Sequence, residues 1–457
     1  MLQRAAGGFG AIALAGLLSE LQGAERSTEH ALVDPLSPRP PQLPARAKRA
    51  IFIFLNGGAS HVETFDHKPR LYADAGKTVS FHEWQGKAGK TEFFLKRPQW
   101  DFKPGGRSGI QVSDLFPHVR EVVDDLCILN SLRSDHTNHY EATLQMHTGS
   151  FTFARPSIGA WLSYGLGSVN RNLPSFVVIT PSMPYAGTQT WGSDFLPGCH
   201  QGTLITPGKE PISNLRSLSQ SKELQELELN FIARANQHHL KTRVRDDALD
   251  ARIRSFETAF GMQQAAPDVF DLNKESDATL NLYGLKRGQT SGFGWQCLVA
   301  RRFAERDVRF IELIHSNWDH HGDMALHADL AREVDQPVAA LIRDLKSRGM
   351  LDDTLVVFTT EFGRTPHHKD KNAKGREHHH QVFSSWLAGG GVRPGTTFGQ
   401  SDEHGIEVAE NPVHLHDFHA TLLHLLGLDH ERLIYRYAGR DYRLTDVHGK
   451  VIREIFA

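Results

Sequence analysis

The stretch Leu355-Val356-Val357-Phe358-Thr359-Thr360, which ends in Glu361, decides the fold class. It is a short run of apolar and β-branched residues, and such a run is typical of a strand buried on both faces, as in a parallel sheet. A turn sequence, residues 362–366, follows directly. We therefore expect Glu361 at the carboxyl end of a central strand, where open α/β sheets bind their ligands.

Other runs of the same kind are spread along the chain. They begin at Ala50, Leu126, Ser175, Val308 and Phe383. Segments with helical periodicity separate them, which favours an α/β fold with a mainly parallel sheet and helices on both faces. The charged segment 213–262 has a helical pattern of its own, so we expect it to form a helical insertion.

The composition excludes several classes of protein. The formal net charge of the 457 residues is -2 and no basic stripe is visible, so nucleic acid is not an expected partner. The 3 Cys form no Cys-x-x-Cys pair and give no disulfide framework. By contrast the chain has 27 His, and about half of them lie in the quarter of the chain between His315 and His424. This clustering indicates imidazole chemistry.

The N-terminal region is unlike the rest of the chain. In residues 1–24 Arg4 precedes a short apolar segment rich in Gly and Ala, which is too short to span a bilayer and is typical of an export signal. The alternative is a mildly apolar tail without that role. Residues 25–48 are rich in Pro and predict a linker before a folded domain over 49–457. We expect a periplasmic or secreted protein without a transmembrane span.

Polar side chains gather after three of the predicted strands, in segments 56–66, 315–323 and 361–380. The ends of parallel strands meet at one sheet edge, so these segments are expected to converge. Carboxylate and imidazole together are ligands of Zn²⁺ and similar ions. Alternatively these groups cap helices and bind loop backbone. Ser60 and Thr137 are candidate nucleophiles, although each hydroxyl also suits a turn or a cap.

Several motifs resemble a bacterial family of unknown function, number fifteen-oh-one, whose members are often labelled sulfatase-like. The matching segments are 56–69, 146–149, 318–321, 361–366, 375–379, 389–391, 416–421 and 429–433. The resemblance implies a fold like that of alkaline phosphatases and sulfatases, which hold metal ions at strand ends. It also implies a twin-arginine export signal, although only Arg4 is present. The chain departs from that superfamily at Asn56, where Asp is usual, and it lacks the Cys-x-Pro-x-Arg sulfatase signature.

Together these observations predict an exported, metal-dependent hydrolase of a phosphate or sulfate ester. The predicted ligands of a divalent ion, Zn, Ca or Mn, are Asp319, His321, Glu361, His378 and His379. Ser60 is the predicted nucleophile. Arg364 is expected to hold anionic oxygens, because a guanidinium suits bidentate contact. The substrate is expected to be an anionic small molecule or polysaccharide. The alternative is a non-catalytic binding protein on the same fold, stabilised by metal.

Overall fold

A mixed sheet of nine strands forms the centre of the computed structural model, which describes residues 34–82, 90–213, 215, 221–241 and 247–457. The strand order is β15-β6-β14-β10-β1-β9-β7-β8, and β18 also pairs with β6. The strands are β1 (Arg49–Leu55), β6 (Leu126–Arg133), β7 (Phe176–Ile179), β8 (Thr203–Ile205), β9 (Phe310–His315), β10 (Thr354–Thr359), β14 (Phe383–Ala388), β15 (Thr396–Phe398) and β18 (Val413–His414). The six predicted strands are therefore confirmed as members of one sheet.

Strand direction follows the expected pattern with one exception. β1 lies between β10 and β9 and is parallel to both. β7 continues the parallel set beside β9, and β8 follows it. β14 is antiparallel to both of its neighbours, β10 and β6. Because two reversals cancel, β6 points the same way as β10, and its carboxyl end lies at the same edge of the sheet.

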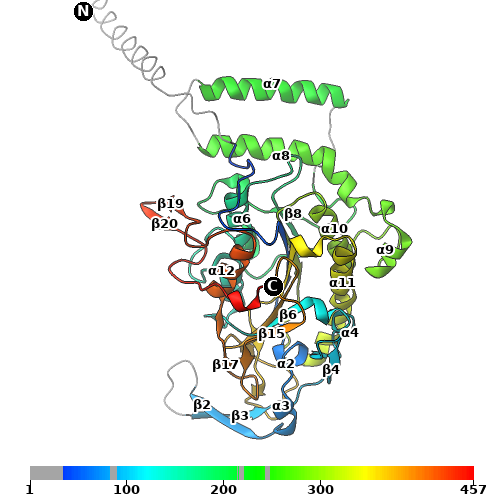
Figure 1. Ribbon diagram of the computed structural model, residues 1–457, viewed down its shortest axis with the longest axis vertical. Helices are drawn as coiled ribbons and strands as arrows, with labels where there is room; N and C mark the ends of the chain where they lie inside the picture. The colour runs from blue at the N-terminus through cyan, green and yellow to red at the C-terminus, as the bar shows by residue number, and fades with distance from the viewer. Residues whose placement is uncertain (1–33, 83–89, 214, 216–220, 242–246) are drawn as a thin grey trace, which may run out of the picture.

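Both faces of the sheet are covered, because alternate residues of β1 belong to different cores. Ile51 and Ile53 pack in one hydrophobic cluster, and Phe52 and Phe54 pack in the other. Helices α10 (Phe293–Ala304) and α11 (His327–Ser347) cover the first face, whereas α6 (Ile158–Leu166) and α12 (Leu415–Leu425) cover the second (Figure 1). Every residue of β1 and β10 is buried, which explains why their sequences show no polar alternation.

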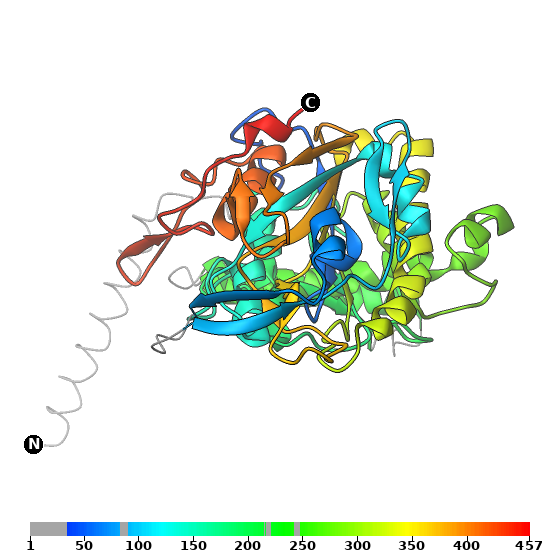
Figure 2. The same ribbon diagram turned by 90° about the horizontal axis from the view of Figure 1, so that it is seen from below.

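The remaining elements lie around this core. The other helices are α2 (His61–Thr64), α3 (Pro69–Ala73), α4 (Pro117–Arg120), α5 (His139–Thr148), α7 (Lys222–Lys241), α8 (Asp247–Phe270) and α9 (Asp277–Leu282). A three-stranded sheet has β3 (Lys90–Leu95) in the middle, between β2 (Thr78–His82) and β12 (His367–His368). The other small sheets are the two-stranded pairs β4 (Phe102–Gly105) with β5 (Ile110–Ser113), β11 (Gly363–Arg364) with β13 (His378–His379), β16 (Gln400–Ser401) with β17 (Val408–Glu410), and β19 (Tyr435–Tyr437) with β20 (Arg440–Tyr442). The α7–α8 pair and the β2–β3 ribbon lie at opposite ends of the molecule (Figure 1), so that the ribbon is in front when the molecule is seen from below (Figure 2).

The N-terminal predictions fall partly outside this structure. Residues 1–24 and the first part of the Pro-rich segment, 25–33, are not among the described residues. The described part of that segment, 34–48, lies along the end of α12, where the backbone N–H groups of Arg46 and Ala47 both donate to the Leu425 carbonyl at 2.9 Å. Within the described ranges, none of the helices has the length and apolar character that crossing a bilayer requires.

Candidate metal centre

The carboxyl ends of β1, β9 and β10 are held together by backbone contacts. The Asn56 N–H donates to the His315 carbonyl at 2.9 Å, and the Gly57 N–H donates to Glu361 Oε1 at 2.8 Å. Gly57 has a φ of +127°, and a Cβ at this position would lie 2.6 Å from the Trp318 nitrogen. Only glycine permits this approach. The three polar segments predicted from the sequence therefore converge at one edge of the sheet.

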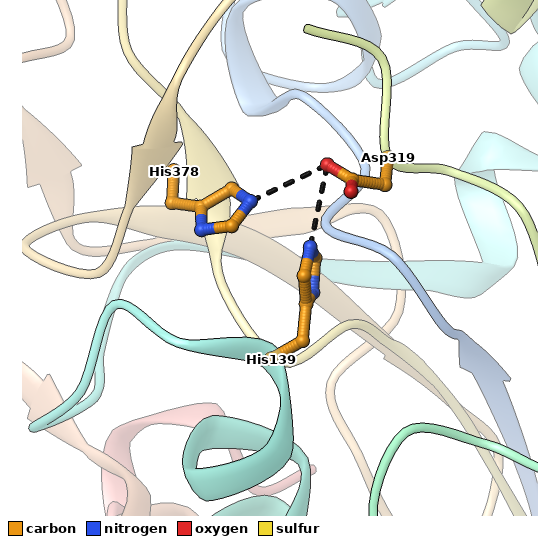
Figure 3. A group of neighbouring side chains, drawn as sticks. All are labelled: His139, Asp319 and His378. Carbon is orange, nitrogen blue, oxygen red and sulfur yellow. Dashed lines mark hydrogen bonds and ion pairs between the residues drawn. The ribbon is translucent and has the colours of Figure 1, made fainter.

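His139, the first residue of α5, lies between two acidic side chains at this edge. Its Nδ1 is 2.7 Å from Glu361 Oε1, and its Nε2 is 3.3 Å from Asp319 Oδ1 (Figure 3). The ring is buried, and its Nε2 has no hydrogen-bond partner among the described residues. α5 follows β6, whose carboxyl end lies at this edge, and this connection places His139 beside Glu361.

Two further imidazoles face the same carboxylate oxygen. His378 comes from β13, and its Nε2 lies 3.3 Å from Asp319 Oδ1 (Figure 3). His321 Nε2 lies 2.9 Å from the same oxygen and 2.9 Å from His378 Nε2. Of these residues, His139, Asp319 and His378 have ligand atoms that all lie within 4.8 Å of one another, so this group could hold a metal ion.

The opposite nitrogen of each ring lies beside an acceptor, which fixes the orientation of the ring. Nδ1 of His378 is 2.6 Å from the Thr137 carbonyl, and Nδ1 of His321 is 2.9 Å from Glu377 Oε2. His139 Nδ1 faces Glu361 in the same way. Each Nδ1 therefore lies beside its acceptor, and each ring turns its Nε2 toward Asp319. Nε2 atoms of three imidazoles around one carboxylate oxygen are a donor set that fits a metal ion. In proteins, carboxylate and carbonyl groups that bind the far nitrogen of a metal-binding imidazole fix the orientation of its ring.

The charges around the centre favour an ionised carboxylate and neutral imidazole. Burial opposes ionisation of Asp319, but the Arg364 guanidinium, which donates to Oδ1 at 2.5 Å, outweighs it and holds the pKa of that carboxyl well below its usual range. Burial, reinforced by the positive charge of Arg364, lowers the pKa of His378 to about 4. The His378 ring is therefore neutral at neutral pH, as a metal ligand must be.

An aromatic ring covers one side of His139. Tyr185, in the loop after β7, stacks on the imidazole with 4.1 Å between ring centroids and an interplanar angle of 12°. Solvent reaches the centre, since the side chains of His321 and Asp319 are 39% and 28% exposed. Burial, and after it the charges of Asp319 and Glu361, raises the pKa of the Tyr185 hydroxyl, which stays protonated at neutral pH.

Two of the predicted ligands take other places. Glu361 is fully buried and lies behind His139 as the acceptor of its Nδ1–H. His379 points to the opposite side of β13 from His378, because successive side chains of a strand alternate. Its Nε2 is 2.7 Å from the Ile406 carbonyl, and its ring stacks on His61. Of the five predicted ligands, the structure therefore gathers Asp319, His321 and His378.

The two residues predicted to be catalytic are buried and do not face a substrate. Ser60 is fully buried at the N-cap of α2, so an ester cannot reach its hydroxyl in this conformation. Arg364 is fully buried as well. Its N–H groups bind the carbonyls of Gly57, Gly58 and Arg376 in addition to Asp319. These contacts leave no bidentate face for an anion, so Arg364 positions Asp319.

The comparisons with known proteins identify the family. The sequence profile of a family described as Protein of unknown function (DUF1501) matches residues 47–456. The chain belongs to this family. The resemblance seen in the sequence motifs is thereby confirmed. No curated protein matches the chain.

Several solved structures are similar to this family member at low sequence identity. A phosphonate monoester hydrolase from Silicibacter pomeroyi is 11% identical over 89% of this chain and 76% of its own, with a TM-score of 0.36. A sulfatase, PsFucS1, from Pseudoalteromonas sp. is 13% identical over 90% of this chain and 70% of its own, with a TM-score of 0.32. The alkaline phosphatase from the Antarctic bacterium TAB5 is 10% identical over 83% of this chain and 98% of its own, with a TM-score of 0.30.

Proposed function

We propose that this protein is a metal-dependent hydrolase of a phosphate or sulfate ester. One observation supports the proposal above all others: three imidazoles, each fixed through Nδ1, direct Nε2 at one oxygen of Asp319. Three or four such ligands match the donor set of catalytic zinc sites, in which protein groups leave a position open. Tyr185 is partly exposed beside this centre, which is consistent with access from solvent.

The residues around this centre have different proposed roles. His139, His378 and Asp319 would hold the ion, with His321 beside them. The bound ion would polarise an ester oxygen and lower the pKa of water. Glu361, the Thr137 carbonyl and Glu377 orient the three imidazoles, and Arg364 keeps Asp319 ionised. Ser60 is fully buried, so no contact between its hydroxyl and the substrate is expected.

Metal content and hydrolysis test the proposal together. Purified protein is expected to bind one divalent ion per chain, and Asp319→Ala is expected to lose it, as measured by elemental analysis after loading with Zn, Ca or Mn. Asp329→Ala, an exposed position of α11, is the matched control and should retain the ion. A panel of aryl phosphate and sulfate esters then measures turnover. A wild-type protein that takes up no stoichiometric metal would contradict the proposal.

A second candidate, a non-catalytic binding protein stabilised by metal, is favoured by the burial of Ser60 and Arg364. In that case the ion would raise the thermal midpoint of unfolding while no ester is hydrolysed. The two candidates share metal binding, so turnover by loaded wild-type protein, abolished by Asp319→Ala, separates them.

We also propose that the protein is exported and acts in the periplasm or outside the cell. The support is the basic residue and short apolar segment within residues 1–24. An anionic small molecule or polysaccharide would be its substrate there. N-terminal sequencing of protein recovered from its native cells tests export. Recovery from the cytosol with residues 1–24 intact would contradict it.

A further inference from the structure

A cavity with several charged residues in its lining lies along the segment that leads into His378. Its volume is about 240 Å³, several times the share of one water molecule, which is about 30 Å³. The lining side chains that matter here are Glu63, Lys96, Arg97, Gln99, Lys374 and Arg376. Arg376 precedes His378 by two residues, and its N–H donates to the His320 carbonyl at 3.3 Å. The cavity, named here the cationic pocket, is thus connected to the metal centre through a short piece of backbone.

Positive charge in the cationic pocket exceeds negative charge. Glu63 is the single carboxylate among its described lining residues, and the buried Arg376 neutralises it with contacts of 2.9 and 2.6 Å to Oε1. The other oxygen, Oε2, accepts from the Gln99 N–H at 2.8 Å. Lys96, Arg97 and Lys374 therefore have no acidic partner in the lining. The whole chain has a formal net charge of -2, so this local excess is not a general property of the surface.

The wall of the pocket is held in place by buried contacts. Arg376 donates to the carbonyls of Thr365, Lys96 and Arg97, and this ties three backbone segments together. The Gln99 amide donates to the Lys374 carbonyl at 3.2 Å. A cavity whose backbone is already ordered loses little conformational entropy when it binds a ligand.

Crowding of like charges gives the pocket a preference for anions. Lys96 is half-buried, and burial followed by the charge of Arg376 lowers the pKa of its ammonium group. Two carboxylates outside the lining interact electrostatically with these lysines, Asp370 with Lys96 and Asp323 with Lys374. An oxyanion in the cavity would relieve the repulsion between cations at short range, where Coulomb energy is largest.

We propose that the cationic pocket binds one sulfate or phosphate group of the same substrate whose ester is cleaved at the metal centre. The substrate would then carry at least two anionic groups. The claim that the pocket and the metal centre bind the same substrate rests on the proposed function, whereas anion binding by the pocket does not depend on it.

Binding of inorganic sulfate and inorganic phosphate by calorimetry tests the pocket. The measurement uses metal-free wild-type protein as the parent, in which Asp319 still neutralises Arg364, so that the centre offers the anion neither an ion nor an unpaired guanidinium. The added double change Lys96→Gln/Lys374→Gln is expected to weaken binding of the preferred anion at least tenfold. Lys371→Gln, an exposed lysine of the same loop that does not line the pocket, should leave it unchanged. Thermal unfolding of each variant checks the fold. Equal affinities in the double variant and its parent, or no binding at all, would overturn the inference.

A second measurement tests the link to the metal centre. Metal-loaded wild-type protein should bind a disulfated disaccharide at least tenfold more tightly than its monosulfated counterpart, and Lys96→Gln/Lys374→Gln should remove that gain. If the pocket binds inorganic sulfate but the second sulfate group adds nothing, the claim of one shared substrate is overturned. If the pocket binds anions but wild-type protein takes up no metal, the proposed hydrolase fails while anion binding by the pocket stands.

Discussion

His378 and His379 are adjacent in β13 but differ in what surrounds them. His378 turns Nε2 to Asp319, whereas His379 is buried against His61 and binds the Ile406 carbonyl. His378→Ala is expected to lower metal content with little change in the free energy of unfolding. His379→Ala is expected to retain the ion but to lose about 1–3 kcal/mol of stability, because a buried carbonyl loses its donor. Elemental analysis and denaturant unfolding measure both effects, and loss of metal in His379→Ala would contradict this assignment.

Glu361 would act on a bound ion through His139, whose Nδ1 lies 2.7 Å from Oε1. Glu361→Gln keeps an oxygen that can accept from Nδ1 but removes the negative charge behind the ring. We expect metal affinity to fall about 10- to 100-fold, which is the usual effect of changing such a partner. Competition with a chromophoric chelator measures the dissociation constant. An unchanged constant would mean that Glu361 serves only to bind the Gly57 backbone.

The sequence identifies part of this centre and misses the rest for physical reasons. Asp319, His321 and His378 follow predicted strands, so their convergence could be predicted. His139 was missed as a ligand because it begins a helix one loop further on, although the polar segment after β6 carries the same signal. The roles predicted for Ser60 and Arg364 rest on residue type and on their place after a strand, and neither of these reveals burial. Burial removes Ser60 from substrate, and carbonyl partners occupy Arg364.

At the scale of elements, the apolar runs predict which segments form the sheet but not their direction. Phe383–Ala388 reads like its parallel neighbours because it too is mostly buried, yet β14 is antiparallel to β10 and β6. Direction depends on the connections, and a hydrophobic run contains no information on them. The reversal does not move the site, because β6 is antiparallel to β14 in turn, so it runs the same way as β10 and places His139 at the same edge.

One buried pair ties the helix that begins with His139 to the sheet. His147 of α5 lies 2.8 Å from Glu312 of β9, and both side chains are buried. His147→Leu alone should cost about 3–5 kcal/mol, because it leaves a buried carboxylate without a partner. The double change His147→Leu/Glu312→Leu should recover most of that loss. Denaturant unfolding of the double-mutant cycle measures this. If the stability losses of the two single variants add up to the loss in the double variant, the two residues are not a coupled pair.

At the scale of the whole molecule, buried histidines predict sensitivity to acid. Burial lowers the pKa of both His200 and His419 to about 3, far below the ordinary value near 6.5. In the unfolded chain each binds a proton as pH falls below 6.5, whereas in the folded protein each stays neutral until about pH 3. Their stabilising contribution is thus present above pH 6.5 and is lost through the window from 6.5 to 3.

At pH 5 the unfolded chain binds these protons and the folded chain does not, which lowers the free energy of unfolding by about 2 kcal/mol for each such histidine. The free energy of unfolding should therefore fall between pH 7 and pH 5, and His419→Gln should make that slope shallower. Val447→Ala, at an exposed position without a titratable side chain, is the control and should leave the slope as it is in wild type. Urea unfolding at several pH values provides the measurement. Identical slopes for wild type and His419→Gln would contradict the assignment.

The ligands of the centre come from segments that lie far apart along the chain: the start of α5, the loop after β9, and β13. An ion bound there acts as a reversible cross-link, because it closes long loops that only the folded backbone brings together. Removing the ion would free these segments to open locally without unfolding the sheet. Limited proteolysis of the metal-loaded chain after chelation should then cut the loops at this edge first, beside the candidate metal centre.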